Sequence, residues 1–599
     1  MNTEAIQLRE LDGSQLYYSI IAGAQRIFDH QKILNKINVF PVPDADTGTN
    51  LASTMRSIVD AKIPIENIKQ TATAIADAAL NGARGNSGII FAQFLYGFSN
   101  EIKVEGKLDV QSFAESMKRA VTYAYEAIAN PVEGTILTVI KDWAEYLYAL
   151  KDIIDDFIRI LIEAYNKAVE SLSETTQKLE VLARAHVVDA GAKGFVYFLE
   201  GILDFFVKGY VAAAREENEE GTQAVNIDEL HEEITFRFCT EAMISGDNLD
   251  KKGIKDQLQH FGDSLVVAGS PKKMRIHLHT DHPAEVFSKL SRLSEITYQK
   301  VDDMIMQNEI MHNRKSDIAI LTDSTCDLPK EILEQYQIHM IPISIHFGES
   351  FYLDRMTMHA QQFYQLQQQK EVRPTTSQPS VKEFQNKFEY LSTHYDSILG
   401  FFISEKLSGT YQNGMKSAKD ISERNGKPSY IFNSRNLTGA LGLIVLRVAR
   451  AVEDGMALEE ILPKIEPWIS KSFLRVTVPT LSYIIQSGRV SPFKGFIART
   501  LDLKPVIAID KEGKSELFGK SFTVKGSQKK LLATVRKIIN GQEVWEYTIT
   551  HANNQEVADY YAGEMKKITG KEPFFVDHIS PALVANTGPG AVGVSFMLK

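Results

Sequence analysis

The chain has 599 residues, of which 44% are hydrophobic and 24% are charged, and its net charge at pH 7 is -10. This length exceeds a single hydrophobic core, so we expect three or four domains, and the acidic balance argues against a nucleic-acid-binding protein. The sequence contains no apolar run long enough to span a bilayer, no secretory signal pattern at its start and only two cysteines, so we expect a cytoplasmic protein.

The first segment is dominated by helical periodicity. From about Ser14 to Val211 apolar residues recur at three- and four-residue steps, as in Ile154, Phe157 and Leu161. This spacing places them on one face of a helix. Strand-like alternation is nearly absent here. The sequence therefore predicts an all-α domain over residues 1–212.

The composition then changes twice. Residues 213–233 are polar and acidic, which predicts a linker. Residues 234–314 alternate short strands and helices, so we expect a small α+β domain there. Its predicted strands are Ile234–Cys239, Ser264–Ala268 and Arg275–Thr280.

Residues 315–599 follow an α/β pattern of apolar strands separated by helices such as Val381–Leu391 and Leu441–Val452. About 280 residues favour two subdomains with a cleft between them. The predicted strands are Ile318–Leu321, Ile338–Ile345, Ile398–Ile403, Tyr547–Thr550 and Phe574–Val576.

The segment NVFPVPDADTGTN contains the first candidate site. Asp44 and Asp46 follow two prolines that prevent a regular helix, and paired carboxylates suit Mg²⁺. Thr47–Thr49 form a predicted polar turn before the helix Leu51–Val59, and backbone N–H groups at a helix start suit phosphate. The alternative is a solvated, Asp-rich turn that caps a helix.

Two glycine-rich segments extend this interpretation. Gly82–Gly88 lies between two predicted helices, and Asp189–Gly194 precedes another. Glycines let the backbone approach a ligand closely. Each segment taken alone is equally well explained as a simple connection between helices.

Together with EGTILTVIKD (Glu133–Asp142), these segments resemble the L-type domain of the dihydroxyacetone kinase family, and most closely the ATP-binding domain of bacterial fatty acid kinase. The resemblance implies a barrel of helices that binds ATP and Mg²⁺. It assigns Asp44 and Asp46 as catalytic metal ligands and places Asn38 near a third ligand position. The nucleotide-contacting positions that it implies are Thr47, Thr49, Asn50, Asn86, Ser87 and Asp189.

The middle segment contains a candidate zinc site. Cys239 ends one predicted strand, and His277 and His279 alternate along another, so both histidines face one side. A thiolate with two imidazoles suits Zn²⁺, although a buried thiol and two ordinary strand histidines fit equally well. The segment FCTEAMI resembles the middle domain of the ATP-binding component of fatty acid kinase, which implies zinc binding by these residues. Asp281 and His282 are alternative ligands.

In the last segment, Thr376, Ser408 and Arg489 combine hydroxyls in predicted turns with a cation, a set that can hold a carboxylate or an acyl phosphate. Segments such as TDSTCDL, RPTTSQPS and NTGPGAVG resemble the DegV-like family, whose members bind one fatty acid. The GxGxxG pattern in the last of these has no following βαβ unit, so it is not a dinucleotide site. Asn586 stands where relatives usually have a head-group histidine, and an amide cannot carry charge.

These resemblances imply a fatty acid kinase in one polypeptide, which uses ATP to phosphorylate a long-chain fatty acid held in the C-terminal half. One alternative is a lipid-binding or lipid-sensing protein with little or no kinase activity, which Asn586 favours. Another is a kinase for a different small substrate. The expected partners are the fatty acid, a downstream acyltransferase, a second copy in a homodimer and, transiently, a membrane surface.

Overall fold

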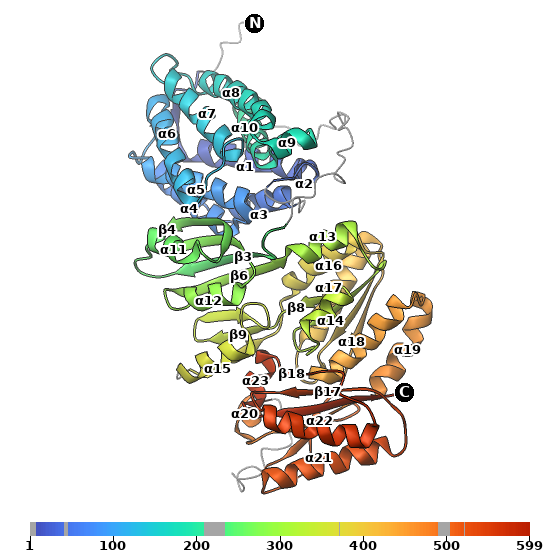
Figure 1. Cartoon of the computed structure of the whole chain (residues 1–599). Coiled ribbons are helices and arrows are strands. Elements are labelled where there is room, and N and C mark those ends of the chain that lie inside the picture. Colours follow the sequence, from blue (N-terminus) through green and yellow to red (C-terminus); the bar gives the residue numbers. More distant parts are fainter. Residues whose placement is uncertain (1–6, 41–45, 209–233, 370–371, 489–503, 520) are drawn as a thin grey trace. The chain divides into compact units, whose positions relative to one another are not determined.

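The computed structural model describes residues 7–40, 46–208, 234–369, 372–488, 504–519 and 521–599. The chain divides into two compact units, Met1–Ile305 and Met306–Lys599 (Figure 1). Among the described residues, no helix combines the length and the apolar character that crossing a bilayer requires. The sequence-based fold class is confirmed, since helical, α+β and α/β segments follow one another along the chain.

The first unit begins with a ring of helices. Successive contacts connect α1, α4, α5, α6, α7, α8 and α10 and return to α1, which corresponds to the barrel that the sequence resemblance implies. The bounds are α1 (Gly13–Asp29), α2 (Gln31–Lys36), α3 (Thr47–Val59), α4 (Ile68–Gly82), α5 (Gly85–Glu101), α6 (Val110–Ala127), α7 (Ile136–Leu150), α8 (Phe157–Lys178), α9 (Glu180–Ala185) and α10 (Ala190–Lys208), with the short strands β1 (Glu10–Leu11) and β2 (Leu108–Asp109).

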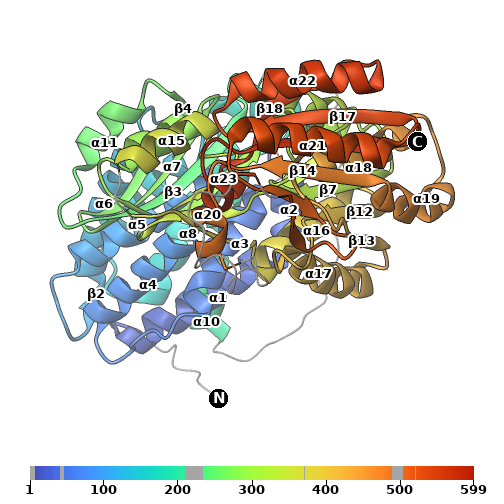
Figure 2. The ribbon, with the colours of Figure 1, turned by 90° about the horizontal axis from the view of Figure 1, so that it is seen from below.

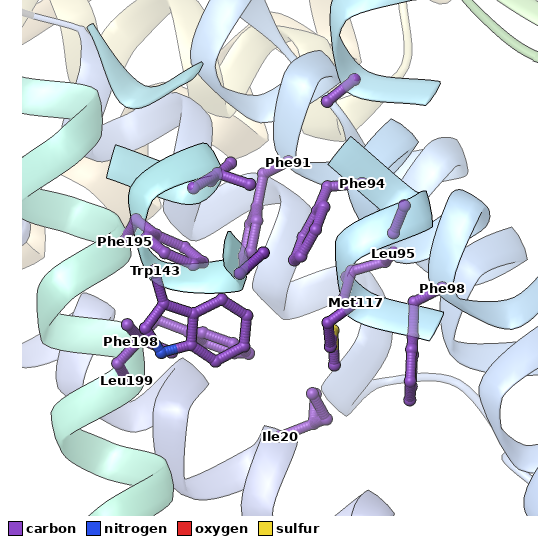
Figure 3. Close-up of a cluster of buried hydrophobic side chains, with 14 of the residues drawn as sticks. Ile20, Phe91, Phe94, Leu95, Phe98, Met117, Trp143, Phe195, Phe198 and Leu199 are labelled. Carbon is purple, nitrogen blue, oxygen red and sulfur yellow. The ribbon is translucent and has the colours of Figure 1, made fainter. Parts of the chain in front are cut away.

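The core of this ring is aromatic, as Figure 3 shows. Phe91 and Phe94 of α5 meet Phe195 of α10 edge to face, and Phe91 also meets Phe198 with ring centroids 4.8 Å apart. Trp143 of α7 packs against Phe195 in the same way. Edge-to-face pairs add to the free energy of burial. Because α5 is apolar on most sides, it lies inside the unit, and its first residues are held firmly in place.

A four-stranded antiparallel sheet completes the first unit, in the order β4-β5-β3-β6. Val266 and Ala268 of β4 belong to the same apolar core as the helices. The sheet therefore packs directly on the helical ring. The bounds are β3 (Phe238–Ser245), α11 (Lys251–Leu258), β4 (Gly262–Ser270), β5 (Lys273–Thr280), α12 (Pro283–Leu290) and β6 (Glu295–Asp303), and α13 (Met304–His312) follows.

The second unit contains three sheets in the part that the structure describes. A parallel sheet has the order β13-β12-β7-β8, a small antiparallel sheet has the order β10-β9-β11, and a mixed sheet has the order β16-β15-β14-β19-β17-β18. The strands are β7 (Ile318–Asp323), β8 (His339–Ile341), β9 (Ser344–Phe347), β10 (Ser350–Leu353), β11 (Thr375–Ser377), β12 (Ser397–Phe402), β13 (Ser429–Asn433), β14 (Ser472–Thr477), β15 (Val506–Ile509), β16 (Ser515–Gly519), β17 (Val544–His551), β18 (Val576–His578) and β19 (Val592–Leu598).

Helices cover these sheets. Strand β19 is buried along its whole length because α18 packs on one face and α21 with α22 on the other. Figures 1 and 2 both show α21 and α22 running side by side. The helices of this unit are α14 (Lys330–Gln335), α15 (Ala360–Gln369), α16 (Val381–His394), α17 (Thr410–Asn425), α18 (Thr438–Glu453), α19 (Leu458–Ser470), α20 (Ser482–Gln486), α21 (Val524–Ile539), α22 (Gln555–Thr569) and α23 (Pro581–Thr587).

Two predicted strands differ from the structure. The run Ile338–Ile345 splits into β8 and β9, which belong to different sheets, because Pro342 has no N–H for a continuous ladder. The run Ile234–Cys239 becomes a strand only at Phe238, where both neighbouring strands offer their last partners. Cys239 therefore lies near the start of its strand. The predicted linker 213–233 lies outside the described residues.

Candidate functional site

A small polar cavity of about 40 Å³, called here the polar cavity, lies in the first unit. By the measure that one bound water needs about 10–15 Å³, it holds a few waters, ions or phosphate oxygens. Side chains from the helical ring and from the middle sheet line it together. They are Asn38, Phe40, Asp46, Thr47, Asn50, Gly85, Asn86, Ser87, Cys239, His277 and His279.

The start of α3 forms one wall of the polar cavity. Asp46 precedes the helix and, within the described residues, makes no capping hydrogen bond to it. Thr47 is already in the first helical turn, so the predicted polar turn is part of α3. Its hydroxyl donates to Oδ1 of Asn38 at 2.6 Å. Asp44, the second predicted carboxylate ligand, lies outside the described residues.

Thr49 faces away from this wall. Its hydroxyl accepts hydrogen bonds from Nε2 of Gln31 and Nδ2 of Asn35, and its N–H donates to Asn35. Residues three apart share a helix face, as Thr47 and Asn50 do, whereas a residue between them points elsewhere. The structure thus brings Thr47 and Asn50, but not Thr49, to the cavity.

The start of α5 forms the second wall. Gly85 has φ of 57°, and a Cβ there would lie 2.3 Å from Nδ2 of Asn50, so both conformation and space require glycine. Asn86 and Ser87 follow in the first turn. Among the described residues, nothing hydrogen-bonds the buried Oδ1 of Asn86, so this atom is available to a ligand.

Asp189 supports the cavity from outside its lining. Its Oδ1 accepts a hydrogen bond from the N–H of Ala192 at 2.7 Å, which caps the start of α10. Burial raises its pKa to about 6. Gly191 brings this loop close to Ser87, because a Cβ at Gly191 would lie 2.6 Å from the Ser87 hydroxyl. Asp189 therefore positions Ser87 in this structure.

The middle sheet contributes Cys239, His277 and His279 to the same cavity. Their ligand atoms all lie within 4.8 Å of one another. Cys239 pairs with His279 across β3 and β5, and Sγ of Cys239 lies 3.9 Å from Nδ1 of His277. In the described part of the chain no group hydrogen-bonds the buried Nε2 of His277.

Carboxylates stand behind this cluster, and sequence reasoning missed both of them. Asp263 Oδ1 lies 3.2 Å from Nδ1 of His279, and Glu241 Oε1 lies 3.8 Å from Nδ1 of His277. Carboxylates in this position orient metal-binding histidines. Glu241 was detectable, because it is two residues after Cys239 and so shares its face of the strand. No signal in the sequence indicated Asp263.

The donor set fits a zinc ion. Burial lowers the pKa of His277, which keeps its ring in the neutral form that metals bind. Burial, and next the Glu241 carboxylate, raise the pKa of the Cys239 thiol, whereas a bound dication has the opposite effect. The alternative ligands lie elsewhere, since Asp281 accepts from the N–H of Arg237 and the His282 side chain is 65% exposed.

The second unit contains a larger cavity of about 480 Å³, called here the apolar cavity. This is the size of sites that enclose small organic ligands. Its wall is mostly aliphatic and comes from β12, β14, β15 and α23 and the segments next to them. Aliphatic lining residues include Ile403, Leu437, Leu474, Val476, Ile507 and Leu583.

Polar groups gather along part of this wall. Thr376, Ser408 and Asn586, all predicted for a lipid head group, line the cavity. Nδ2 of Asn586 donates to the carbonyl of Ala582 at 2.8 Å and lies 3.5 Å from the Thr376 hydroxyl. Ser408 and Thr410 share a hydrogen bond of 2.8 Å. Arg489, the predicted cation, lies outside the described residues.

Two buried carboxylates hold the helix that carries Asn586. Asp354 Oδ1 accepts from the N–H of Ala582, and Asp327 Oδ1 accepts from the N–H of Ser580, both at 3.1 Å. Burial raises the pKa of each carboxyl to about 7, despite the nearby Arg355. Since these contacts start α23, they determine where Asn586 points.

Comparison with known families agrees with this division of the chain. Residues 41–204 match the model of the DAK2 domain, and residues 235–311 match that of the FakA-like middle domain of fatty acid kinase. Residues 317–599 match the model described as uncharacterised protein, DegV family. The chain thus carries a DAK2 domain, a FakA-like middle domain and a DegV domain, as the sequence resemblance predicted.

Similar proteins cover parts of the chain. An uncharacterized protein of Staphylococcus epidermidis is 35% identical over 323 residues, which are 52% of this chain and 58% of that protein. Protein YloV of Bacillus subtilis is 32% identical over 329 residues, which are 52% of this chain and 59% of YloV. The chain therefore spans less than two thirds of these relatives.

Solved structures similar to this chain include a fatty-acid-binding DegV family protein of Thermus thermophilus, 25% identical with a TM-score of 0.44, which covers 47% of this chain and 99% of its own. The fatty acid binding protein DegV of Bacillus subtilis is 26% identical, also with a TM-score of 0.44, and covers 47% and 100%.

Proposed function

We propose, on the premise that this chain joins a DAK2 domain, a FakA-like middle domain and a DegV domain, that it is a fatty acid kinase. It transfers the γ-phosphate of ATP to the carboxylate of a long-chain fatty acid and yields acyl phosphate and ADP. The observation that carries the proposal is the convergence of Asp46, Asn86 and the Cys239–His277–His279 cluster on the polar cavity.

In the polar cavity, Asp46 and Asn38 offer oxygen ligands of the kind that Mg²⁺ prefers. The Oδ1 atom of Asn86, which has no hydrogen-bond partner among the described residues, adds a third. The chemistry that bound Mg²⁺ supplies is neutralisation of phosphate charge. Thr47 holds Asn38 in place through its 2.6 Å hydrogen bond. The N-termini of α3 and α5 present backbone N–H groups to the phosphates.

In the apolar cavity, the aliphatic wall encloses the acyl chain and excludes water from it. Thr376, Ser408 and Asn586 bind the carboxylate through hydrogen bonds, which fix the direction of its oxygens. A cavity of about 480 Å³ supports a ligand of this class.

The reaction needs no general base. A fatty acid carboxyl group is ionised at neutral pH, as model carboxyl groups are, so its oxygen is already a nucleophile. That oxygen forms the new bond to the γ-phosphorus while the bond between γ-phosphorus and the bridging oxygen breaks, and ADP leaves with the electron pair. The protein then contributes alignment and electrostatic stabilisation.

The test is formation of labelled acyl phosphate by the purified full chain with Mg²⁺, ATP and a panel of long-chain fatty acids. We expect product that disappears in Asp46→Ala. The matched control is Asp60→Ala, which removes an exposed carboxylate at the other end of the same helix and leaves the rate unchanged. Full activity of Asp46→Ala would remove this metal assignment.

A second function, fatty acid binding without phosphoryl transfer, is favoured by Asn586. Its amide is bonded within its own helix and carries no charge. Under this alternative the purified chain retains a fatty acid, detected by mass spectrometry, yet forms no acyl phosphate with any acid in the panel.

A further inference from the structure

Glu241 makes an unusual set of contacts beside the polar cavity. It lies on β3 and is 1% exposed. Oε1 accepts a hydrogen bond from the N–H of Gly85 at 2.8 Å, across 156 residues of sequence, and Oε2 accepts from Nη2 of Arg275 at 2.5 Å. One buried carboxylate thus bonds the helical ring and the middle sheet at the same time.

The contact with Gly85 falls at a sensitive position. Gly85 is the first residue of α5, and its N–H belongs to the group that has no partner inside the helix. The next two residues, Asn86 and Ser87, line the polar cavity. A carboxylate at a helix start is also favoured by the helix dipole. The position of Gly85 therefore determines where Asn86 and Ser87 face the cavity.

The other side of Glu241 faces the metal-type cluster. Glu241 is paired in register with His277, and its Oε1 is 3.8 Å from Nδ1 of that residue. Arg275 supplies the compensating charge: it is 1% exposed, and its guanidinium carbon lies 4.2 Å from the ring centroid of Tyr298. Without such a partner a buried carboxylate is strongly unfavourable.

We propose that Glu241 is a positioning residue that sets the Gly85–Ser87 turn against the cysteine–histidine cluster, so that nucleotide binding by the helical ring depends on the middle sheet. The inference rests on the proposed function, because it assumes that the polar cavity binds ATP. Glu241 acts through Gly85 and touches no reacting atom itself.

The same helix offers a matched control. Gln93 of α5 is also 1% exposed, and its Oε1 accepts from the N–H of Gly269 on β4 at 2.7 Å. This hydrogen bond also joins helix and sheet, but Gln93 does not line the polar cavity among the described residues. Gln93→Leu therefore removes an equivalent connection without moving the turn.

The experiment compares two double variants of the full chain. E241Q/R275M and E241L/R275M both remove the buried ion pair, and only the first keeps an oxygen that can accept from Gly85. Affinity for a non-hydrolysable ATP analogue with Mg²⁺ is measured by calorimetry, at a temperature at which each chain remains folded in a melting experiment.

We expect E241L/R275M to bind the analogue about tenfold more weakly, since it leaves a buried N–H without its acceptor. E241Q/R275M and Gln93→Leu stay within about threefold of the unaltered chain. Equal affinity of both double variants overturns the inference, whether both are strong or both are weak. If E241L/R275M does not fold, E241Q replaces it, because one amide oxygen cannot accept from both Gly85 and Arg275.

The outcome also separates the inference from the proposed function. An unaltered chain that binds no nucleotide with Mg²⁺ refutes the proposed function, and the inference falls with it. An unaltered chain that binds the analogue, with variants that all bind it equally, refutes the role of Glu241 alone.

Discussion

The Sγ atom of Cys239 lies 3.9 Å from Nδ1 of His277, on the neighbouring strand of the same sheet. With His279 they present one sulfur and two ring nitrogens to a cavity that is also lined by Asp46 and Asn86. The cluster that was predicted for zinc and the residues that were predicted for ATP and Mg²⁺ therefore belong to one site.

A first prediction concerns zinc. We expect about one zinc ion per chain after purification without chelator, because the three donors match a zinc site with an open fourth position. Cys239→Ala lowers the content well below that value in elemental analysis. Cys326→Ala is the matched control, since Cys326 is buried in the core of the second unit. Equal zinc in both variants contradicts the assignment.

A second prediction separates two threonines that the sequence motif groups together. Thr47→Val should weaken ATP analogue binding by about three- to tenfold, because Asn38 loses its 2.6 Å hydrogen bond. Thr49→Val should change affinity by less than about threefold, since Thr49 is exposed and bonds Gln31 and Asn35. A reversed order would place the nucleotide on the other face of α3.

A third prediction concerns stability and pH in the second unit. Burial raises the pKa of Asp354 to about 7 against the opposing effects of Ser324, Ala582 and Arg355, with Asp323 adding to the rise. The folded state then binds more protons than the unfolded state between about pH 4 and 7. The stability from this group is complete below pH 4 and is lost as the pH rises towards 7.

Asp354→Asn keeps an acceptor for the N–H of Ala582 and removes the titration. We expect the melting temperature of the variant, relative to the unaltered chain, to increase from pH 5 to pH 8. The control is Asp396→Asn, whose carboxylate is 75% exposed and should show no such trend. A pH-independent difference for Asp354→Asn would mean that its carboxyl group does not titrate in this range.

A fourth prediction concerns the head-group position in the apolar cavity. Asn586→His replaces an uncharged amide with an imidazole whose ordinary pKa is near 6.5. Fatty acid affinity of the variant, measured by fluorescence displacement, should increase as the pH falls below about 6.5, relative to the unaltered chain. Asn554→His lies near the cavity but bonds the carbonyl of Gly590 instead, and serves as the control. The same pH profile in both variants would exclude Asn586 from the head-group site.

Periodicity along the chain was sufficient for much of the fold. The three- and four-residue spacing predicted the helical domain, and alternation placed His277 and His279 on one face of a strand, where both are buried. These features depend on neighbours within a few residues, and backbone geometry alone enforces them. The breaks in the pattern were local as well, such as Pro342 dividing β8 from β9.

The composition of the site depended on contacts between distant segments. Gly85 and Glu241, 156 residues apart, meet only because α5 packs against the middle sheet, and this packing also brings Cys239 to the cavity that Thr47 lines. Thr49 and Asp189 match the motif as well as Thr47 does, yet hydrogen bonds direct them elsewhere. Sequence spacing determined which residues share a helix or strand face, and burial of the apolar core between those elements decided which faces meet.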